Sequence, residues 1–326
     1  ITLHAKTLIY SILMATKNTF KEVKIEANSR LHLGFISLNS STPFTYGGVG
    51  ISISGQATIV NIKKSKKFES NLPKNITDKI LNFLRLKKLH TMIKIDCMHC
   101  PENHIGLGSG TQLILSVEEL ITEFYKLDIN PNIFNRKFRS GIGVNSYTKG
   151  GFIVDAPKNN LSQTEIIFQT KFPLEWKAIL LFDNKKKGLH GKSEKNFFAS
   201  TSSHNLRKNL SDITLNELIP SVIYKDFRIF AKSLTKFQKL NAMFYSKVQK
   251  SLYLSNDINK IINQISKQFI VGCGQSSWGP TSYMFVDSKN DLNEILPILD
   301  KAISMYNNLS YEVVSAKNKA RKLIYT

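Results

Sequence analysis

The chain has 326 residues, enough for two domains of ordinary size or a single large one, and its apolar content of 42% argues against wholesale disorder. Lys and Arg total 45 against 24 Asp and Glu, a formal net charge of +21 that points to anionic partners, nucleic acid among them. Only seven of the basic residues are Arg, the side chain suited to bidentate base contacts, so we favour compositional bias over a nucleic-acid surface.

The first 15 residues are mildly apolar but too few to span a bilayer, and a small-residue cleavage site is missing, which argues against a signal peptide. The chain begins with Ile, and Met14 is a candidate start. We therefore expect residues 1–20 to be a non-native or disordered extension. The three cysteines form no disulfide framework, and together with the missing signal they predict a cytoplasmic protein.

The segment from residue 21 to about 157 reads as strands followed by a helix. Apolar residues alternate over 23–27 and again over 51–59, which is the period of half-buried strands. Gly47-Gly48-Val49-Gly50 between them predicts a turn or a loop of close approach. A helix is expected over 76–86 and an extended segment over 91–98.

The next motif is Cys97-Met98-His99-Cys100, whose residue types suit zinc. A second pair of ligands is missing, so we favour the end of a strand that leads into the glycine-rich loop behind it. That loop runs straight into a helix with apolar residues at helical spacing. Glycines let the backbone approach an anion, and a helix start offers unpaired N–H groups and a positive dipole end. The sequence therefore predicts a phosphate or diphosphate site, formed by Gly106, Leu107, Gly108, Ser109, Gly110, Thr111 and Gln112.

Arg136 and Arg139 follow this helix, and Arg139 lies directly before Ser140-Gly141. Either they grip a second phosphate or they lie on a helix surface, and Arg139 is the better candidate because glycine follows at once. Gly150-Gly151 then predicts a turn into a strand that ends near Asp155.

The second half of the chain predicts the order β-α-β-β-α-β, the split βαβ arrangement. Its expected elements are a strand over 176–183, helices over 214–223 and 225–240 that Pro220 bends or separates, a helix over 258–267, a strand near Phe269, a strand over 282–286, a helix over 292–306 and a strand over 311–316. The stretch 184–210 is rich in Lys, Asn and Ser and is expected to be a mobile loop over the site. It contains His190, which we expect to be exposed to solvent, as a single histidine in a polar loop usually is.

A second glycine-rich segment, Gly272–Thr281, lies about half a chain beyond the first. Either segment alone is more often a turn than a site. Two of them in separate halves predict a small-molecule cleft between domains. The substrate-binding candidates are Ser140, Gly274, Gln275, Ser276, Ser277 and Trp278, of which Trp278 either packs the segment or stacks on an aromatic ligand.

Arg30 and His32 lie two residues apart on a predicted strand and therefore face the same side. That side is either a polar cleft wall or a solvated sheet face. With Arg139 they are the candidate catalytic residues.

Taken together, these motifs resemble the GHMP kinase superfamily, and within it one branch, the β-ribofuranosylaminobenzene 5′-phosphate synthases of tetrahydromethanopterin biosynthesis. The matching stretches keep their order from about residue 22 to 290. They are Ser29–Gly34, Gly47–Ile51, His104–Gln112, Arg139–Gly143, Gly150–Asp155 and Gly272–Thr281.

The resemblance implies an α+β fold with two domains: residues 21–170, similar to ribosomal protein S5 domain 2, and residues 171–326, a ferredoxin-like domain. It also implies a homodimer and a magnesium-dependent pentosyltransferase. Such an enzyme joins 5-phosphoribosyl 1-diphosphate to 4-aminobenzoate or 4-hydroxybenzoate and releases carbon dioxide and diphosphate. Trp278 and Phe152 are expected to flank the aromatic acid. The metal ligands stay open, with Glu102, Asp155 and Glu194 the acidic groups nearest the motifs.

One departure bears on the reaction. Many GHMP kinases carry an Asp in the stretch that corresponds to residues 140–147, where it acts as base, and no carboxylate occurs there in this chain. Its absence favours the synthase without excluding a kinase, because some kinases of the superfamily also lack it. An ATP-dependent small-molecule kinase and a basic nucleic-acid-binding protein therefore stay open as alternatives.

Overall fold

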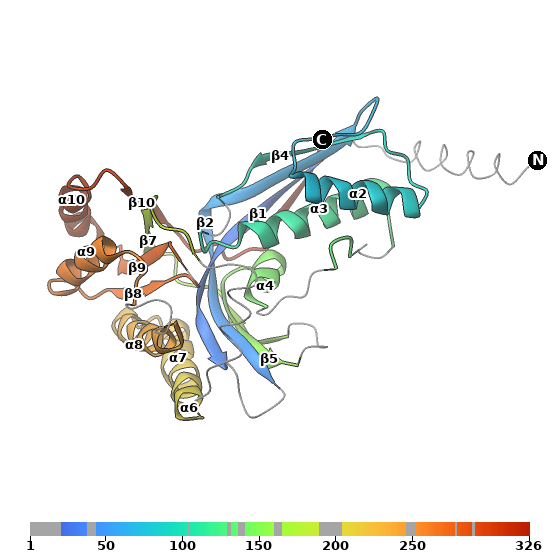
Figure 1. Cartoon of the computed structure of the whole chain (residues 1–326). Coiled ribbons are helices and arrows are strands. Elements are labelled where there is room, and N and C mark those ends of the chain that lie inside the picture. The colour runs from blue at the N-terminus through green and yellow to red at the C-terminus, as the bar shows by residue number, and fades with distance from the viewer. Residues whose placement is uncertain are drawn as a thin grey trace, which may run out of the picture.

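The computed structural model describes residues 21–37, 44–102, 105–128, 132–135, 141–159, 165–188, 204–245, 252–277, 279–288 and 291–326. The extension expected over residues 1–20 lies outside these ranges. Within them the chain forms two sheets with helices on their faces (Figure 1). The two-domain boundaries predicted from the sequence stay a prediction.

The first sheet is built on two long antiparallel strands, β1 (Glu22–Ser37) and β2 (Thr45–Lys64). The other strands of this sheet are β3 (Glu69–Ser70), β4 (Ile93–His99), β5 (Phe152–Lys158), β6 (Ile166–Thr170) and β11 (Lys322–Tyr325). β4 pairs with the second half of β2, whereas β5 pairs with its first half. β11, from the end of the chain, pairs with β1 and closes the sheet on that side.

The expected turn at residues 47–50 is wrong, because these residues are the start of β2. Gly48 pairs with Phe35 on one side and with Asp155 on the other. A side chain at Gly50 would run into the side chain of Ile142. The glycines therefore let neighbouring strands and the residue Ile142 come close to β2. Close approach is the second of the two possibilities that the sequence left open.

Three helices cover the N-terminal part of this sheet: α2 (Lys74–Leu86), α3 (Ser109–Tyr125) and α4 (Ile142–Thr148). Figure 1 shows α2 and α3 lying along β1 and β2. Apolar residues at helical spacing on α3 are buried against Ile25 and Ile62 of the sheet. The helix expected after the glycine loop is thus present, and so is the helix expected over 76–86.

The second sheet contains β7 (Trp176–Asp183), β8 (Gly272–Gln275), β9 (Ser282–Asp287) and β10 (Leu309–Val314). Their order across the sheet is β10-β7-β9-β8, with every neighbouring pair antiparallel. With helices between β7 and β8 and between β9 and β10, this is the βαββαβ arrangement predicted from the sequence.

Helices cover both faces of the second sheet. The helices α9 (Asn256–Ser266) and α10 (Leu292–Ile303) pack on the outer face of this sheet. The inner face is covered by α6 (His204–Asp212), one π-helical turn η1 (Ile213–Leu218), α7 (Ile219–Ile223) and α8 (Phe227–Tyr245). Pro220 lies at the start of α7, which continues directly from η1, and the helical run goes on to Ile223. The break before α8 therefore falls at residues 224–226 and not at Pro220.

Two sequence expectations in this half are corrected. The stretch 184–210 is helical from His204 on, while residues 189–203 lie outside the described ranges. The strand expected near Phe269 is instead formed by Gly272–Gln275, inside the glycine-rich segment itself. Side chains at Gly272 and Gly274 would collide with α8, so glycine here lets the strand and the helix touch.

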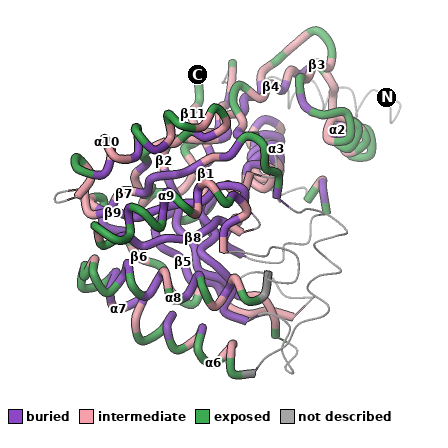
Figure 2. The backbone as a smooth tube through the Cα atoms, turned by 60° about the vertical axis from the view of Figure 1, so that its left-hand side comes forward, coloured by how far each residue is buried: buried purple, intermediate pink, exposed green. Residues whose placement is uncertain are grey.

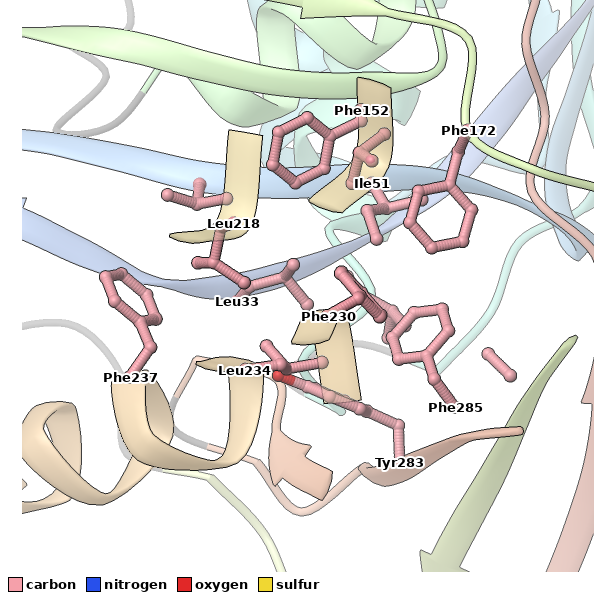
Figure 3. Close-up of a cluster of buried hydrophobic side chains, with 14 of the residues drawn as sticks. Leu33, Ile51, Phe152, Phe172, Leu218, Phe230, Leu234, Phe237, Tyr283 and Phe285 are labelled. Atoms are coloured by element: carbon pink, nitrogen blue, oxygen red, sulfur yellow. The ribbon is translucent and has the colours of Figure 1, made fainter. Parts of the chain in front are cut away.

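The largest core lies between the two sheets and joins residues from β1, β2, β5, β7, β9 and α8 (Figure 3). The ring of Phe172 lies 5.3 Å from those of Trp176 and Phe230, centroid to centroid. Phe152 belongs to this core and stacks on Phe172 at 6.4 Å. The expectation that Phe152 flanks an aromatic substrate is therefore wrong, because its side chain is fully buried among other rings. In Figure 2 the buried tube likewise concentrates in the central strands.

Candidate active site

The first glycine-rich loop ends at the start of α3. Gly108 precedes the helix in the left-handed conformation, with φ +82°, and no side chain caps the helix. The backbone N–H groups of Thr111 and Gln112 donate to the Gly108 carbonyl at 2.9 and 3.2 Å. Within the described ranges the N–H groups of Gly108 and Ser109 find no acceptor. An uncapped, largely buried helix start of this kind is a ready site for an anion.

Arg30 of β1 lies against this loop. Its backbone N–H donates to the Leu107 carbonyl at 3.1 Å, and its Nη1 donates to the Gly106 carbonyl at 2.5 Å. A Cβ atom on Gly108 would lie 3.1 Å from the guanidinium carbon. The loop therefore needs glycine there both for its positive φ and for the space that Arg30 fills. A fixed cation and the positive end of α3 consequently share one place.

Ser276 joins the second glycine-rich segment to this arrangement. Its buried hydroxyl donates to the Gly106 carbonyl at 2.6 Å and accepts the His32 backbone N–H at 3.0 Å. The Ser277 N–H donates to the His32 carbonyl at 3.2 Å. The structure thus brings together both glycine-rich segments and the strand that carries Arg30 and His32.

Two residues that the sequence did not single out, Gln238 and Asn241 of α8, complete this joint. Gln238 donates from Nε2 to the Leu33 carbonyl and accepts the Gln275 N–H at 3.0 Å. Asn241 accepts the Phe35 N–H through Oδ1 at 2.8 Å. The sequence offers one hint of this role, which is that the two polar residues lie three apart on a helix with many apolar residues. From the sequence alone, the same spacing fits two side chains at the solvated edge of the helix.

His32 is buried, with 4% of its surface exposed, and its ring packs against Phe35 at 4.6 Å between centroids. Neither ring nitrogen has a hydrogen-bond partner among the described residues. Burial, and secondarily the charge of Arg30, lowers the pKa of His32 to about 3. The imidazole is therefore neutral at physiological pH and offers one N–H donor and one nitrogen acceptor. Beside it is a cavity of about 10 Å³ that Gln238, Gln275 and Ser277 also line, which admits about one water-sized group.

Asp155 holds the neighbouring backbone in place. One carboxylate oxygen accepts the Gly48 N–H at 2.5 Å and the other accepts the Gly141 N–H. The side chain is buried and so joins β2 to the start of α4. Each oxygen of Asp155 thus has a structural partner, and the magnesium role considered for this residue stays a prediction. Glu102 is exposed, Glu194 lies outside the described ranges, and no cluster of three His, Cys, Asp or Glu side chains suited to a metal occurs among the described residues.

Other predicted site residues are occupied within the protein. Gln112 is fully buried and donates from Nε2 to the Gly143 carbonyl at 2.8 Å. Gln275 accepts the Leu254 N–H through Oε1 at 2.7 Å, and Gly274 packs on Gln238. Arg139, Ser140 and Trp278 lie outside the described ranges, as do His104, Arg136 and His190. The roles predicted for these residues stay predictions.

The chain matches no family model. It is 27% identical to the β-ribofuranosylphenol 5′-phosphate synthase of Methanocaldococcus jannaschii, over 89% of this chain and 99% of that protein. The protein of the same name from Methanothermobacter thermautotrophicus is 28% identical over 82% of this chain and 90% of its own length. This chain is a distant homologue of the β-ribofuranosylphenol 5′-phosphate synthases. The resemblance drawn from the motifs is confirmed at that level.

Solved structures show the fold. A homoserine kinase from Cytophaga hutchinsonii superposes with a TM-score of 0.67 at 13% identity, covering 94% of this chain and 99% of its own. Mevalonate-3-kinase from Thermoplasma acidophilum gives 0.63 at 12% identity over 94% and 98% of the two chains. The predicted GHMP-kinase-like α+β fold is therefore confirmed. Each helix in the described ranges is too short or too polar to span a bilayer.

Proposed function

We propose that this homologue of the synthases is a decarboxylating pentosyltransferase acting on 5-phosphoribosyl 1-diphosphate and a 4-substituted benzoate. The observation that carries the proposal is the relationship over 99% of the Methanocaldococcus jannaschii protein, in a chain whose two glycine-rich segments meet at the Gly106 carbonyl, to which Arg30 also donates. The relatives' name refers to a phenol, which favours 4-hydroxybenzoate over 4-aminobenzoate as the acceptor. The homodimer and the cytoplasmic location stay predictions.

The start of α3 suits the diphosphate of the donor. Negative charge grows on the leaving diphosphate as the bond between C1 of ribose and oxygen breaks. The N–H groups of Gly108 and Ser109, which find no acceptor among the described residues, lie beside the cation of Arg30, and together they would stabilise that charge. Since all of them are fixed by hydrogen bonds or by helix geometry, little reorganisation is needed when the bond breaks.

The acceptor needs orientation rather than an enzyme nucleophile. The ring carbon that bears the carboxylate attacks C1 and forms the new carbon–carbon bond. Loss of carbon dioxide then returns the electron pair of the broken bond to the ring. Water must be excluded, because it would otherwise capture the ribosyl cation. The buried joint between the segments, with Ser276 at its centre, provides a dry wall for such a step.

His32 suits the hydroxyl end of the acceptor. Its neutral ring would accept a hydrogen bond from the phenol and so increase the electron density of the attacking carbon. The cavity of about 10 Å³ beside it has room for one oxygen atom but none for a ring, so we assign to His32 only this contact. Because the pKa of His32 is low, the ring stays uncharged and adds no second positive charge near Arg30 or the developing ribosyl cation.

Magnesium has no preformed protein cage among the described residues. Each oxygen of Asp155 accepts a backbone N–H group, and no suitable cluster occurs in the described ranges. The magnesium requirement therefore stays a prediction, and none of the steps above depends on the ion.

The decisive experiment supplies purified protein with phosphoribosyl diphosphate, magnesium and carboxyl-labelled 4-hydroxybenzoate. We expect labelled carbon dioxide together with a C-riboside phosphate detected by mass spectrometry, and a slower reaction with 4-aminobenzoate. Release of neither product with either acid, from protein that melts cooperatively, contradicts the proposal. A parallel reaction with ATP tests the kinase alternative, for which ADP formation would be diagnostic.

A further inference from the structure

A second and larger cavity, of about 770 Å³, lies in the C-terminal half of the chain. One wall is α8, the opposite wall is α9, and residues 269–273 at the start of β8 form the floor. This volume is in the range of small-molecule sites. Five α8 residues line it and recur at the spacing of one helix face: Lys232, Thr235, Lys236, Lys239 and Leu240. Gln238 and Asn241, which bind β1, project from a different face of α8.

The α8 wall is cationic. Lys236 is neutralised by Glu217, whose Oε1 lies 2.8 Å from its Nζ. Lys232 and Lys239 have no ion-pair partner within the described ranges. They are seven residues apart, which on a helix is about 10 Å. One carboxylate, Asp212, also lines the cavity, and its Oδ1 accepts a hydrogen bond from Asn216 at 2.7 Å.

The rest of the lining is apolar or neutral. Phe269, Ile270 and Val271 form the floor, and Ile270 is 37% exposed although it is a large aliphatic residue. On the α9 wall, Asn263 donates from Nδ2 to Oδ1 of Asn259 at 3.3 Å. These amides can bind a polar group without adding charge. An apolar floor beside two lysines that have no ion-pair partner among the described residues selects for a molecule with a hydrophobic body and a negative end.

We propose that this cavity is a second ligand site, for an organic anion with an apolar body and one or two acidic groups. The body lies on the floor at residues 269–271, and the acidic group lies at Lys232 or Lys239. The site shares no residue with Arg30 or the start of α3, so it stands independently of the proposed reaction. It is nevertheless close to that site in the chain, because Cys273 lines the cavity and Gln275, two residues on, binds Gln238.

The test uses 8-anilinonaphthalene-1-sulfonate, an aromatic body with one sulfonate, in a fluorescence titration of the full chain. A single sulfonate pairs with only one of two lysines that lie about 10 Å apart, so the test variant is the charge-reversed K232E/K239E, which replaces that attraction with repulsion and is expected to weaken binding about fivefold. The control double variant K74E/K301E makes the same change of charge at exposed positions outside the cavity and should change the affinity less than about twofold. Equal affinities of the two double variants would overturn the proposal.

Two further measurements separate the parts of the proposal. Asn263→Trp fills the cavity from an exposed position and should abolish binding, whereas Gln264→Trp, its exposed neighbour outside the lining, should not. Retained binding by folded Asn263→Trp would show that the dye sits elsewhere. The neutral probe N-phenyl-1-naphthylamine should bind the wild-type chain more weakly than the sulfonate does. Equal affinity for the two probes would mean that the lysines do not favour an anionic ligand over a neutral one. That result would overturn the proposal that the site binds an anion.

Discussion

The two glycine-rich segments look alike in sequence but use glycine for different physical reasons. In the first, Gly106 and Gly108 have φ of +91° and +82°, which other residues adopt only with strain. In the second, Gly279 also has a positive φ, of +68°, but Gly272 and Gly274 are ordinary extended residues of β8, and what these two lack is room for a side chain beside α8. The first segment has backbone N–H groups without an acceptor among the described residues, which suits it to bind a ligand. The β8 glycines of the second segment allow the strand to pack closely against α8, which is a structural role.

This contrast makes separable predictions. Substitutions at the first segment and at Arg30 should damage donor binding and turnover more than stability. Substitutions at Gly272 and Gly274 should damage stability first.

The largest effect is expected from Arg30→Lys. Lysine keeps the charge but loses the planar fork that reaches the Gly106 carbonyl while facing the start of α3. We expect kcat/KM for phosphoribosyl diphosphate to fall about 100-fold or more, a loss of about 3 kcal/mol in transition-state stabilisation. Steady-state kinetics measure it, with the exposed Arg228→Lys as control. A loss smaller than threefold would remove Arg30 from the reaction.

Gly274→Ala is expected to have the largest effect on stability. The new methyl group would lie 2.5 Å from Cδ of Gln238, inside a packed joint. Overpacking of this kind costs about 2–3 kcal/mol, which urea unfolding measures. Gly272→Ala, whose methyl group would lie 3.0 Å from the Ala231 Cα, should cost less. The reverse ranking would argue against close packing as the reason for glycine here.

His32→Gln tests the neutral imidazole at the junction of the two segments. A histidine in the unfolded chain protonates below about pH 6.5, whereas the pKa of His32 in the folded protein is about 3. The unfolded state therefore binds more protons between these values, and the free energy of unfolding falls as the pH falls through that window. Between pH 7 and 5 the wild-type chain should lose about 2 kcal/mol that His32→Gln does not lose. Parallel pH dependences of unfolding in the two proteins would show that His32 is not held neutral.

Gly108→Ala should have the smallest effect on stability, about 1 kcal/mol, from the strain of a side chain at positive φ. Its methyl group would nevertheless lie 3.1 Å from the guanidinium carbon of Arg30 and would displace that cation from its place beside the helix start. We therefore expect the affinity for inorganic diphosphate, measured by calorimetry, to fall about tenfold. If Gly108→Ala and Gly274→Ala lose stability and diphosphate affinity in the same proportion, the contrast between the segments fails.

Local periodicity was enough to predict most of the fold. The helix after the first glycine loop buries its apolar face, and the second sheet has the predicted βαββαβ order. The strand β8 was missed because its glycines give no strand signal, and their reason for being there is the helix α8 packed against them. A pattern read along the chain does not contain that partner.

The candidate site was predictable only in part, for the same reason. Arg30 and the glycine loop carry local signals, and the structure brings them into contact. Gln238 has no such signal, and the sequence marks Asp155 only as an acidic group near the motifs. The role of each is identified by the distant backbone groups that it binds. The ion pair of Arg321 with Glu119, 202 residues apart, likewise cannot be predicted from the sequence. It follows only once β11 is known to pair with β1.

The central claim is that an anion binds at the start of α3. Titrating protein that carries nitrogen-15 in its glycine and serine amides with inorganic diphosphate, and following the amide resonances by NMR, tests this claim most directly. We predict saturable shifts of the Gly108 and Ser109 resonances, with those of Gly272 and Gly274 nearly unmoved. Unmoved Gly108 and Ser109 resonances at saturating diphosphate would contradict it.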